Sequence, residues 1–451
     1  MRAFYENSLV VLAGGLILFA PLFRSGKTFF ALMTMELIGI AMLLIILWSN
    51  LLSGRMQKHV KWFLFAGFGV ALAYLVPLPT SLWEILPGRS WYVEHVTWAN
   101  ATSTEYTYRA LSLIPYRTIS GLLALIAPLA LFLTALSLPE RKLYWIIYVL
   151  LLAATGQAVL SMLQYFIQDQ DLFFRVWSGN IPLGTYINQN HFVAFMEMAE
   201  PLALGLMIVV LTQHNTGIIT KTVLTILFGL ISLALTFTPL LSASRTGTAL
   251  LLLSIFLSFW VMTTPELRKK VAAPIIGLRF VLLVLAVAIQ LNVIQRIATE
   301  SYTTGFEPKV VAGDLRWTIY TSTWEGVKYY FPFGSGPGTM PQAYQMFQPT
   351  NLSAFMNHAH NDYLELIFDM GLFGILIILG IVVIYIYRWK EIWQGINIPF
   401  KLMQSGAGVG ILLALLYSIT DFGLHTPANA IFFALLFGIF LHQPHPKQLL
   451  K

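Results

Sequence analysis

The chain contains no cysteine and few charged residues. Among its 451 residues, only 10% are Asp, Glu, Lys or Arg. The absence of cysteine excludes disulfides and metal sites built from thiolates. A soluble domain carries about 25% charged residues, so most of the surface of this chain is unsuited to water.

Long hydrophobic runs recur along the chain, and 57% of its residues are hydrophobic. A helix needs roughly 20 apolar residues to cross a bilayer. The sequence therefore predicts an all-α polytopic membrane helical bundle, a single membrane domain over residues 1–451. Its expected spans, about twelve, lie near 8–24, 30–52, 62–78, 118–137, 143–167, 191–212, 222–241, 246–263, 271–292, 362–387, 403–420 and 427–441.

Lysine and arginine fall unevenly between the two sides of this bundle. With the N-terminus inside, the inside segments carry Arg2, Arg55, Lys58, Lys61, Arg141, Lys142, Lys221, Arg268, Lys269, Lys270, Arg388, Lys390, Lys401, Lys447 and Lys451. The short outside loops hold only Arg24, Lys27, Arg175 and Arg245. Cytoplasmic loops are rich in Lys and Arg, so we expect both termini to be cytoplasmic. The formal net charge of +7 then reflects membrane topology and not nucleic-acid binding.

Two outside segments are long. Residues 79–117 are rich in Trp and Tyr, which is typical of the membrane interface and also suits stacking on sugars. Residues 293–361, between the ninth and tenth spans, form the largest loop subdomain. Within it, apolar residues three and four apart over 314–330 predict an amphipathic helix lying on the membrane. The glycine-rich run 334–338 that follows predicts a sharp turn or a close backbone approach.

Polar residues gather directly before the tenth predicted span, in HAHNDYLELIFDMGLFG at 358–374. Such groups are costly to desolvate beside a bilayer, so they call for an explanation. His358 and His360 are two residues apart, and only one of them is expected to point into a given site. Histidine accepts a proton near neutral pH and suits a general base. The alternative is a histidine that merely hydrogen-bonds loop backbone at a helix start.

Two arginines fall on the same predicted side. Arg245 stands between two apolar runs, flanked by Ser244 and Thr246, and Arg316 begins the predicted amphipathic helix. The planar guanidinium can bind a phosphate through two hydrogen bonds. The alternative is an arginine at the membrane boundary that only extends its charged group into water. With a histidine on the same face, the pair predicts a diphosphate clamp beside a base. Both guanidiniums should then come within about 10 Å of each other and of His360.

Further polar candidates lie at other outside helix ends. Asn190 and His191 stand where the sixth span begins, and Asp421 and His425 mark the turn between the last two spans. An asparagine or aspartate that only caps a helix is the plainer interpretation of these positions. The DQD triplet 169–171 resembles a nucleotide-sugar metal motif, but nucleotide sugars are cytoplasmic and this loop is outside, so we predict no metal site.

The chain resembles the O-antigen ligase and polymerase superfamily. The motifs that carry this resemblance are His360-Asn361 with Gly371 and Gly374, Asn190-His191-Phe192, Ser244-Arg245-Thr246-Gly247, Arg316 with the later run Pro332–Gly338, and Asp421. Members have about a dozen helices, cytoplasmic termini and one long periplasmic loop between the ninth and tenth spans. The resemblance implies a bacterial inner-membrane protein with its active site on the periplasmic face.

The resemblance also implies chemistry. A glycan would move from an undecaprenyl diphosphate carrier to an acceptor hydroxyl that His360 activates, while Arg245 and Arg316 hold the diphosphate. His358, Asn361, Asp362, Asn190, His191 and Asp421 would support this site, without metal or cofactor and with inversion at the anomeric carbon.

The acceptor stays open at the level of sequence. Ligation to lipid A-core is favoured, because a single large loop stands just before His360. Polymerisation of O-antigen or exopolysaccharide is the alternative. Protein O-glycosylation and transport of a lipid or solute are less favoured. The transporter has less support, because the spans carry few charges and the chain shows no internal repeat.

Overall fold

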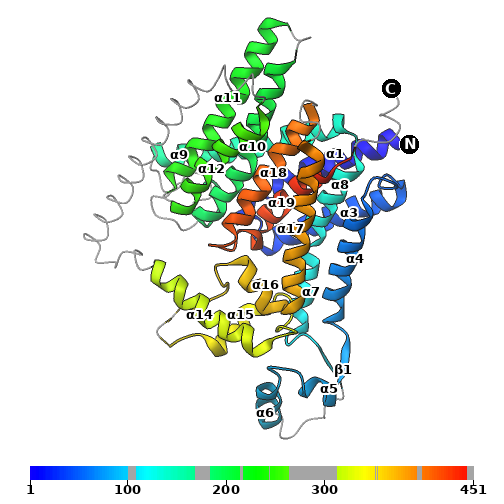
Figure 1. Ribbon diagram of the computed structural model, residues 1–451, viewed down its shortest axis with the longest axis vertical. Helices are drawn as coiled ribbons and strands as arrows, with labels where there is room; N and C mark the ends of the chain where they lie inside the picture. The colour runs from blue at the N-terminus through cyan, green and yellow to red at the C-terminus, as the bar shows by residue number, and fades with distance from the viewer. Residues whose placement is uncertain are drawn as a thin grey trace, which may run out of the picture.

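A computed structural model describes residues 1–99, 108–167, 183–213, 217–242, 244–263, 312–350, 352, 354–393 and 399–443. The chain folds almost entirely as helices, which gather into one bundle with a smaller layer against one end (Figure 1). Eight helices within the described residues are long and apolar enough to cross a membrane. These are α1 (Arg2–Phe19), α3 (Phe29–Ser49), the run α7–α8 (Pro115–Ser137), α9 (Glu140–Ile167), α10 (Gln189–Thr212), α11 (Ile218–Leu241), α17 (Leu372–Trp393) and α18 (Pro399–Tyr417).

The predicted all-α polytopic bundle is therefore confirmed. The shorter apolar helices α12 (Arg245–Met262) and α19 (Pro427–Leu441) coincide with two further predicted spans. The span expected near 62–78 corresponds to α4 (Lys58–Ala73), whose 16 residues fall short of the long helices. The span expected near 271–292 lies outside the described residues.

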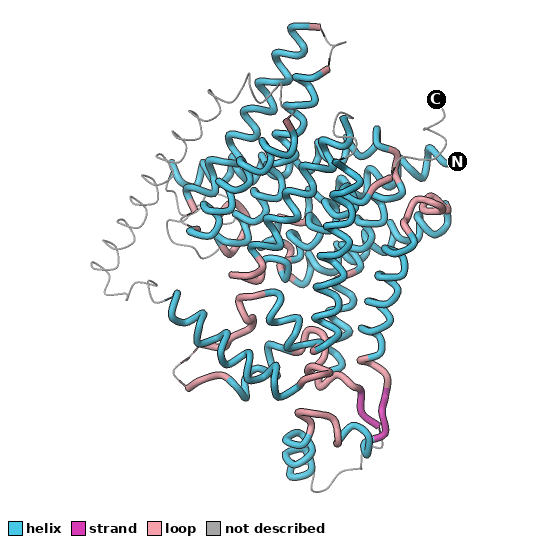
Figure 2. The backbone as a smooth tube through the Cα atoms, viewed as in Figure 1, coloured by secondary structure: helices cyan, strands magenta, loops and turns pink. Residues whose placement is uncertain are grey.

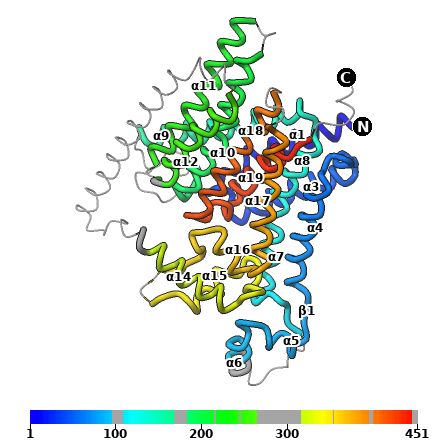
Figure 3. Tube along the Cα trace, viewed as in Figure 1, coloured from blue at the N-terminus to red at the C-terminus, as the bar shows by residue number. Residues whose placement is uncertain are grey.

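The inner helices of the bundle are α10 and α18, which are mostly buried, whereas few residues in the apolar windows of α11 and α17 are buried. α10 packs against α11, α12 and α18, and α19 packs between α18 and α8. Large apolar side chains fill these contacts, as in the stack of Phe195 on Phe432 with ring centroids 4.2 Å apart. Although α1 and α19 come from opposite ends of the chain, they also touch (Figure 3).

The expected span near 362–387 is two helices and not one. α16 (Asp362–Met370) ends at Gly371, and the long apolar helix α17 begins at Leu372. Gly371 has φ +55°, and a Cβ there would stand 2.1 Å from the carbonyl oxygen of Pro332. The glycine-rich run approaches the same corner, because a Cβ on Gly334 would lie 2.3 Å from the carbonyl oxygen of Asp369. Only glycine allows the two segments to meet so closely.

A layer of short elements covers one end of the bundle (Figure 2). It comprises α14 (Ala312–Tyr330), α15 (Met340–Ala343), the 3₁₀ turn η2 (Tyr344–Phe347) and α16. α14 coincides with the amphipathic helix predicted over 314–330. Its Val327 and Tyr330 pack with Phe368 of α16, while Trp317 and Trp324 are exposed.

The first long loop forms a small unit of its own. β1 (Pro77–Pro79) pairs antiparallel with β2 (Tyr108–Ala110), and α5 (Thr80–Glu84) and α6 (Ser90–Ala99) lie between them in sequence. Its buried Arg89 donates hydrogen bonds to the carbonyls of Pro87 and Leu111 and lies over the ring of Tyr330. This arginine therefore fastens the first loop to the layer that carries α14 and α16.

Candidate active site

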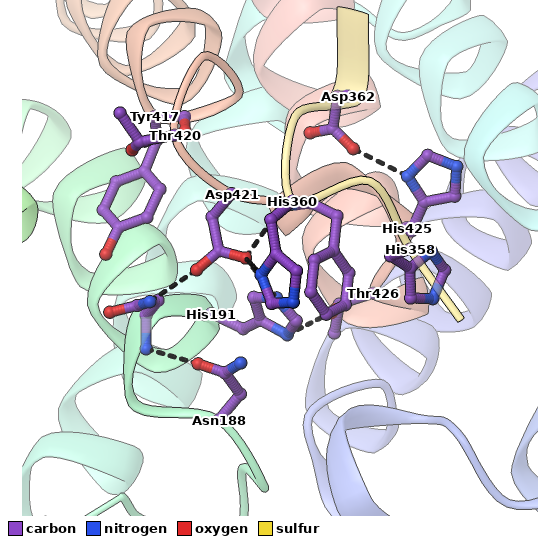
Figure 4. A network of polar contacts seen from close by, with 12 residues as sticks. Asn188, His191, His358, His360, Asp362, Tyr417, Thr420, Asp421, His425 and Thr426 are labelled. Carbon is purple, nitrogen blue, oxygen red and sulfur yellow. Dashed lines mark hydrogen bonds and ion pairs between the residues drawn. The ribbon is translucent and has the colours of Figure 1, made fainter. Parts of the chain in front are cut away.

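Asp421 is the point at which the predicted site residues meet. It lies between α18 and the 3₁₀ turn η3 (Gly423–His425), and it is 1% exposed. Its Oδ1 accepts a hydrogen bond from the backbone N–H of Phe422 at 2.9 Å and lies 3.4 Å from His360 Nδ1. Its Oδ2 accepts from the side-chain amide of Asn190 and lies 3.7 Å from a guanidinium nitrogen of Arg316. Figure 4 shows Asp421 facing His360 and His191 beside it.

His360 stands at the bend immediately before α16. Its φ is +52°, which is uncommon for a residue with a side chain. The next residue, Asn361, caps the helix by accepting the N–H of Leu364 at 2.9 Å. The phenol of Tyr320 in α14 donates to the carbonyl of His360 at 2.9 Å. This bend turns the ring so that Nδ1 faces Asp421, and Nε2 is the nitrogen left for a substrate.

The two predicted arginines come from helix starts beside Asp421. Arg316 lies in the second turn of α14, and one third of its side chain is exposed. Arg245 is the first residue of α12, and its side chain lies outside what the structure describes. Its neighbour Ser244 caps α12 and donates to the side-chain carbonyl of Asn190 at 2.9 Å. The backbone of Arg245 is thus one residue away from the network around Asp421.

The start of α10 supplies the other side of this network. Asn188 caps the helix, as the sequence predicts for this region, and Asn190 bridges Ser244 to Asp421. His191 is buried, with Nδ1 2.7 Å from the hydroxyl of Thr426 and Nε2 3.8 Å from Asp421 Oδ1. Both α10 residues singled out from the sequence therefore contact or approach the same carboxylate.

The surroundings of Asp421 keep its carboxyl charged. Burial by itself would raise the pKa of Asp421, but the contacts and charges of His191 and His360 lower it well below the usual range. A carboxylate fixed in this way stabilises an imidazolium at His360, as the third member of a catalytic triad does. The arrangement can accept a proton at His360 and hold an anion at Arg316.

A second polar cluster lies behind the loop of His360. His358 Nδ1 is 3.0 Å from Glu365 Oε1, and His425 Nε2 is 3.2 Å from the same oxygen. His425 Nδ1 also lies 2.6 Å from Asp362 Oδ1. Burial would lower the pKa of His425, but the charge of Glu365 and the hydrogen bond to Asp362 raise it to about 10. The structure thus turns His358 toward Glu365 and away from Asp421, so that of the two histidines only His360 faces the carboxylate.

The ligand atoms of His358, Glu365 and His425 lie within 4.8 Å of one another, close enough to hold a metal ion. Protons also complete this cluster, because a protonated His425 donates one hydrogen bond to each of two carboxylates. The cluster therefore ties the bend before α16 to η3 with or without an ion.

Two residues of the site, Phe422 and Lys27, give no signal in the sequence. Phe422 is the centre of a ring of polar groups: His358 stacks on it at 4.1 Å, and His191 and His360 meet its edge at 4.7 and 4.8 Å. Lys27 Nζ lies 5.4 Å from the same ring. A phenylalanine in a turn and a lone loop lysine are both common, so only the fold identifies them.

Comparison with protein families matches residues 230–379 to the family described as O-antigen ligase. The matched segment extends from α11 into α17 and includes Arg245, Arg316 and His360. The resemblance to the O-antigen ligase superfamily predicted from the sequence is thereby confirmed over this segment. No curated protein matches the chain.

Proposed function

We propose that this protein is a glycosyltransferase of the bacterial inner membrane that moves a glycan from an undecaprenyl diphosphate carrier to an acceptor hydroxyl. The observation that carries the proposal is the meeting of His360 and Arg316 on opposite oxygens of one buried carboxylate, Asp421, beside the start of α12. A base and a phosphate-binding cation held within a few ångströms of each other suit the transfer of a sugar from a phosphate leaving group.

His360 acts as the general base in this proposal. A sugar hydroxyl is a weak nucleophile, and a base within hydrogen-bond reach raises its reactivity as it attacks the anomeric carbon. The proton moves to His360 Nε2, and Asp421, 3.4 Å from Nδ1, stabilises the imidazolium that results. The contact is longer than an ideal hydrogen bond, as is common in sites without substrate.

Arg245 and Arg316 hold the departing diphosphate. Negative charge grows on it as the glycosidic bond breaks, and preplaced guanidiniums stabilise that charge in a site with little water. The hydroxyl attacks from the face opposite the diphosphate, so the anomeric carbon inverts. The mechanism calls for no metal or cofactor, because the arginines supply the positive charge.

The proposed location is the periplasmic face of the membrane, with both termini cytoplasmic. Residues 27, 190, 244, 316, 360 and 421 all come from segments that the distribution of lysine and arginine assigns to the outside. Their convergence at one end of the bundle supports that assignment, because residues assigned to opposite faces would not meet.

The acceptor we favour is lipid A-core, which makes the protein an O-antigen ligase. The feature in favour is the single large loop, 293–361, directly before His360. Polymerisation of O-antigen or exopolysaccharide is the second candidate, since the same base and clamp serve either reaction.

Deletion of the gene in its host separates these two functions. Loss of the ligase leaves lipid A-core without polymer while carrier-linked polymer accumulates. Loss of the polymerase leaves single repeat units on the core. Unchanged glycoconjugates in the deletion strain would contradict both functions.

A further inference from the structure

Lys27 is brought to the site by an unusual turn. From the second residue of α2 (Leu22–Ser25) to Gly26 just after it, four consecutive residues, 23–26, have positive φ, and three of them carry side chains. The turn packs tightly on the start of α19, because a Cβ on Gly26 would lie 3.3 Å from Pro427. Left-handed backbone at three such residues is sparsely populated and persists only where the surroundings determine it. The position of Lys27 is therefore determined by the fold.

The amino group of Lys27 forms no ion pair with a carboxylate of the described residues. Its Nζ lies 5.4 Å from the centroid of Phe422, and among the described residues it makes no hydrogen bond or ion pair. The side chain is only partly exposed, and this burial lowers the pKa of Lys27, which the charge of Asp421 offsets in part. A cation withdrawn from water without a partner is costly, so an anion from outside the chain would complete the site.

The cations of the site lie on two sides of Asp421. Arg316 approaches Oδ2, and so does Asn190, which connects to the start of α12 where Arg245 stands. His191 and His360 approach Oδ1 and also surround the edge of Phe422, which is the ring that Lys27 faces. Lys27 is thus placed with the base, on the side away from Arg316.

We propose that Lys27 is an anion-binding subsite for the acceptor, which holds a phosphate or carboxylate group close to the hydroxyl that His360 activates. The inference rests on the proposed function. Attack with inversion requires the hydroxyl and the diphosphate to lie on opposite faces of the sugar, so a cation beside the base and apart from Arg316 suits the acceptor. The acceptor would accordingly be an anionic glycan, and the enzyme would discriminate against a neutral one.

The test measures binding, so that it does not depend on turnover. The proteins are wild type, Lys27→Met and Lys27→Arg in nanodiscs, with Lys61→Met as a matched control, since Lys61 also lies over an aromatic ring, 5.8 Å from Phe65. The ligands are lipid A-core bearing its phosphates, the same glycolipid after dephosphorylation, and undecaprenyl diphosphate. Thermal unfolding checks that each variant is folded.

We expect Lys27→Met to weaken binding of the phosphorylated glycolipid about tenfold, as for the loss of a hydrogen bond to a charged group. Binding of the dephosphorylated glycolipid and of undecaprenyl diphosphate should stay the same, and Lys27→Arg should retain most of the affinity. Lys61→Met should change nothing.

Three results would overturn the proposal. Weaker binding of undecaprenyl diphosphate by Lys27→Met would place Lys27 in the donor site. An equal effect on both forms of the glycolipid, or none, would make Lys27 structural. Failure of wild type to bind the phosphorylated glycolipid would remove the subsite. The proposed function fails by a separate result, namely that wild type forms no product from donor and either glycolipid.

Discussion

At the scale of the residue, Asp421 organises the site because its two oxygens serve different partners. One oxygen faces His360 and the other faces Arg316, so one buried charge lies against both the proposed base and the proposed phosphate-binding group. Burying a carboxylate is costly unless its oxygens are occupied, and the four side chains around Asp421 provide that occupation. The chemistry and the stability of this corner of the protein therefore depend on the same contacts.

Replacing His360 by alanine should abolish most glycan transfer while the protein remains folded. Loss of a general base typically costs about 10²–10⁴ in rate. The ring of His360 is 31% exposed and contributes little to packing, so expression and thermal unfolding should stay near wild type. Transfer from carrier-linked glycan to acceptor, followed on a gel, measures the effect.

His358→Ala is the informative comparison, because His358 contacts Glu365 and stacks on Phe422. It should lower thermal stability more than His360→Ala and activity less. An inactive His358→Ala beside an active His360→Ala would show that the base is assigned to the wrong histidine.

Lysine in place of either arginine should impair transfer although the charge is kept. A lysine ammonium cannot form the bidentate pair with phosphate that a guanidinium forms. We expect Arg245→Lys and Arg316→Lys each to lower kcat/KM for the donor at least tenfold, whereas Lys328→Arg, on an exposed surface of α14, should have no effect.

A donor kcat/KM unchanged by Arg316→Lys would remove that residue from the clamp. The proximity of the Arg245 guanidinium to His360, within about 10 Å, stays a prediction.

The sequence identifies those residues of the site that are unusual at a membrane boundary, and it misses those that are common there. A His-Asn pair, an arginine between two apolar runs and an aspartate in a helix turn are all rare at a membrane boundary, and the structure brings His360, Arg316 and Asp421 together. Lys27 and Phe422 belong to ordinary loops, and nothing local relates position 27 to position 422. Lys27 lies near Phe422 because the α2–α3 turn packs against α19, and no sequence pattern predicts this contact.

At the scale of the element, the corner at Gly371 divides what hydropathy presents as one span. The run 362–387 is apolar on average, which hides the three acidic residues in its first third, Asp362, Glu365 and Asp369. Each of these carboxylates has partners in the covering layer or in the loops. Asp369, for example, accepts the backbone N–H groups of Gly338 and Met340. Charge position within the run, more than its mean hydropathy, marks the boundary between α16 and α17.

Gly371→Ala should destabilise the protein by roughly 2 kcal/mol or more, because a side chain at φ +55° is strained and its Cβ would stand 2.1 Å from the Pro332 carbonyl oxygen. Thermal unfolding in detergent measures the loss. Gly156→Ala is the matched control: its Cβ would meet nothing within 4 Å, so alanine there should be neutral or slightly stabilising. Equal unfolding temperatures for the two variants would show that the corner at Gly371 adapts to a side chain.

At the scale of the whole molecule, the site lies at one end of the bundle and not halfway through it. A transporter would place charged groups along a path across the bilayer and bind its substrate near the midplane. Here the candidate residues gather where α10, α12, α16 and α18 begin or end. The architecture suits a reaction at a membrane surface.

Purified protein in liposomes should therefore form product from a carrier-linked glycan and an acceptor without ATP and without an ion gradient. The leaving diphosphate supplies the driving force for transfer. The His360→Ala protein, reconstituted in the same way, is the control for product formed without the enzyme. Movement of the glycolipid across the bilayer with no transfer product would contradict the enzyme hypothesis.

The position of Asp421 in the chain determines when the site is completed during synthesis. The turn that carries it joins α18 to α19, and both helices follow His360 and the two arginines in the chain. Until that hairpin has entered the membrane, the bend of His360 has no carboxylate to face and Arg316 has no partner. We therefore expect a chain truncated between α17 and α18 to carry His360 and both arginines but to be inactive toward carrier-linked glycan.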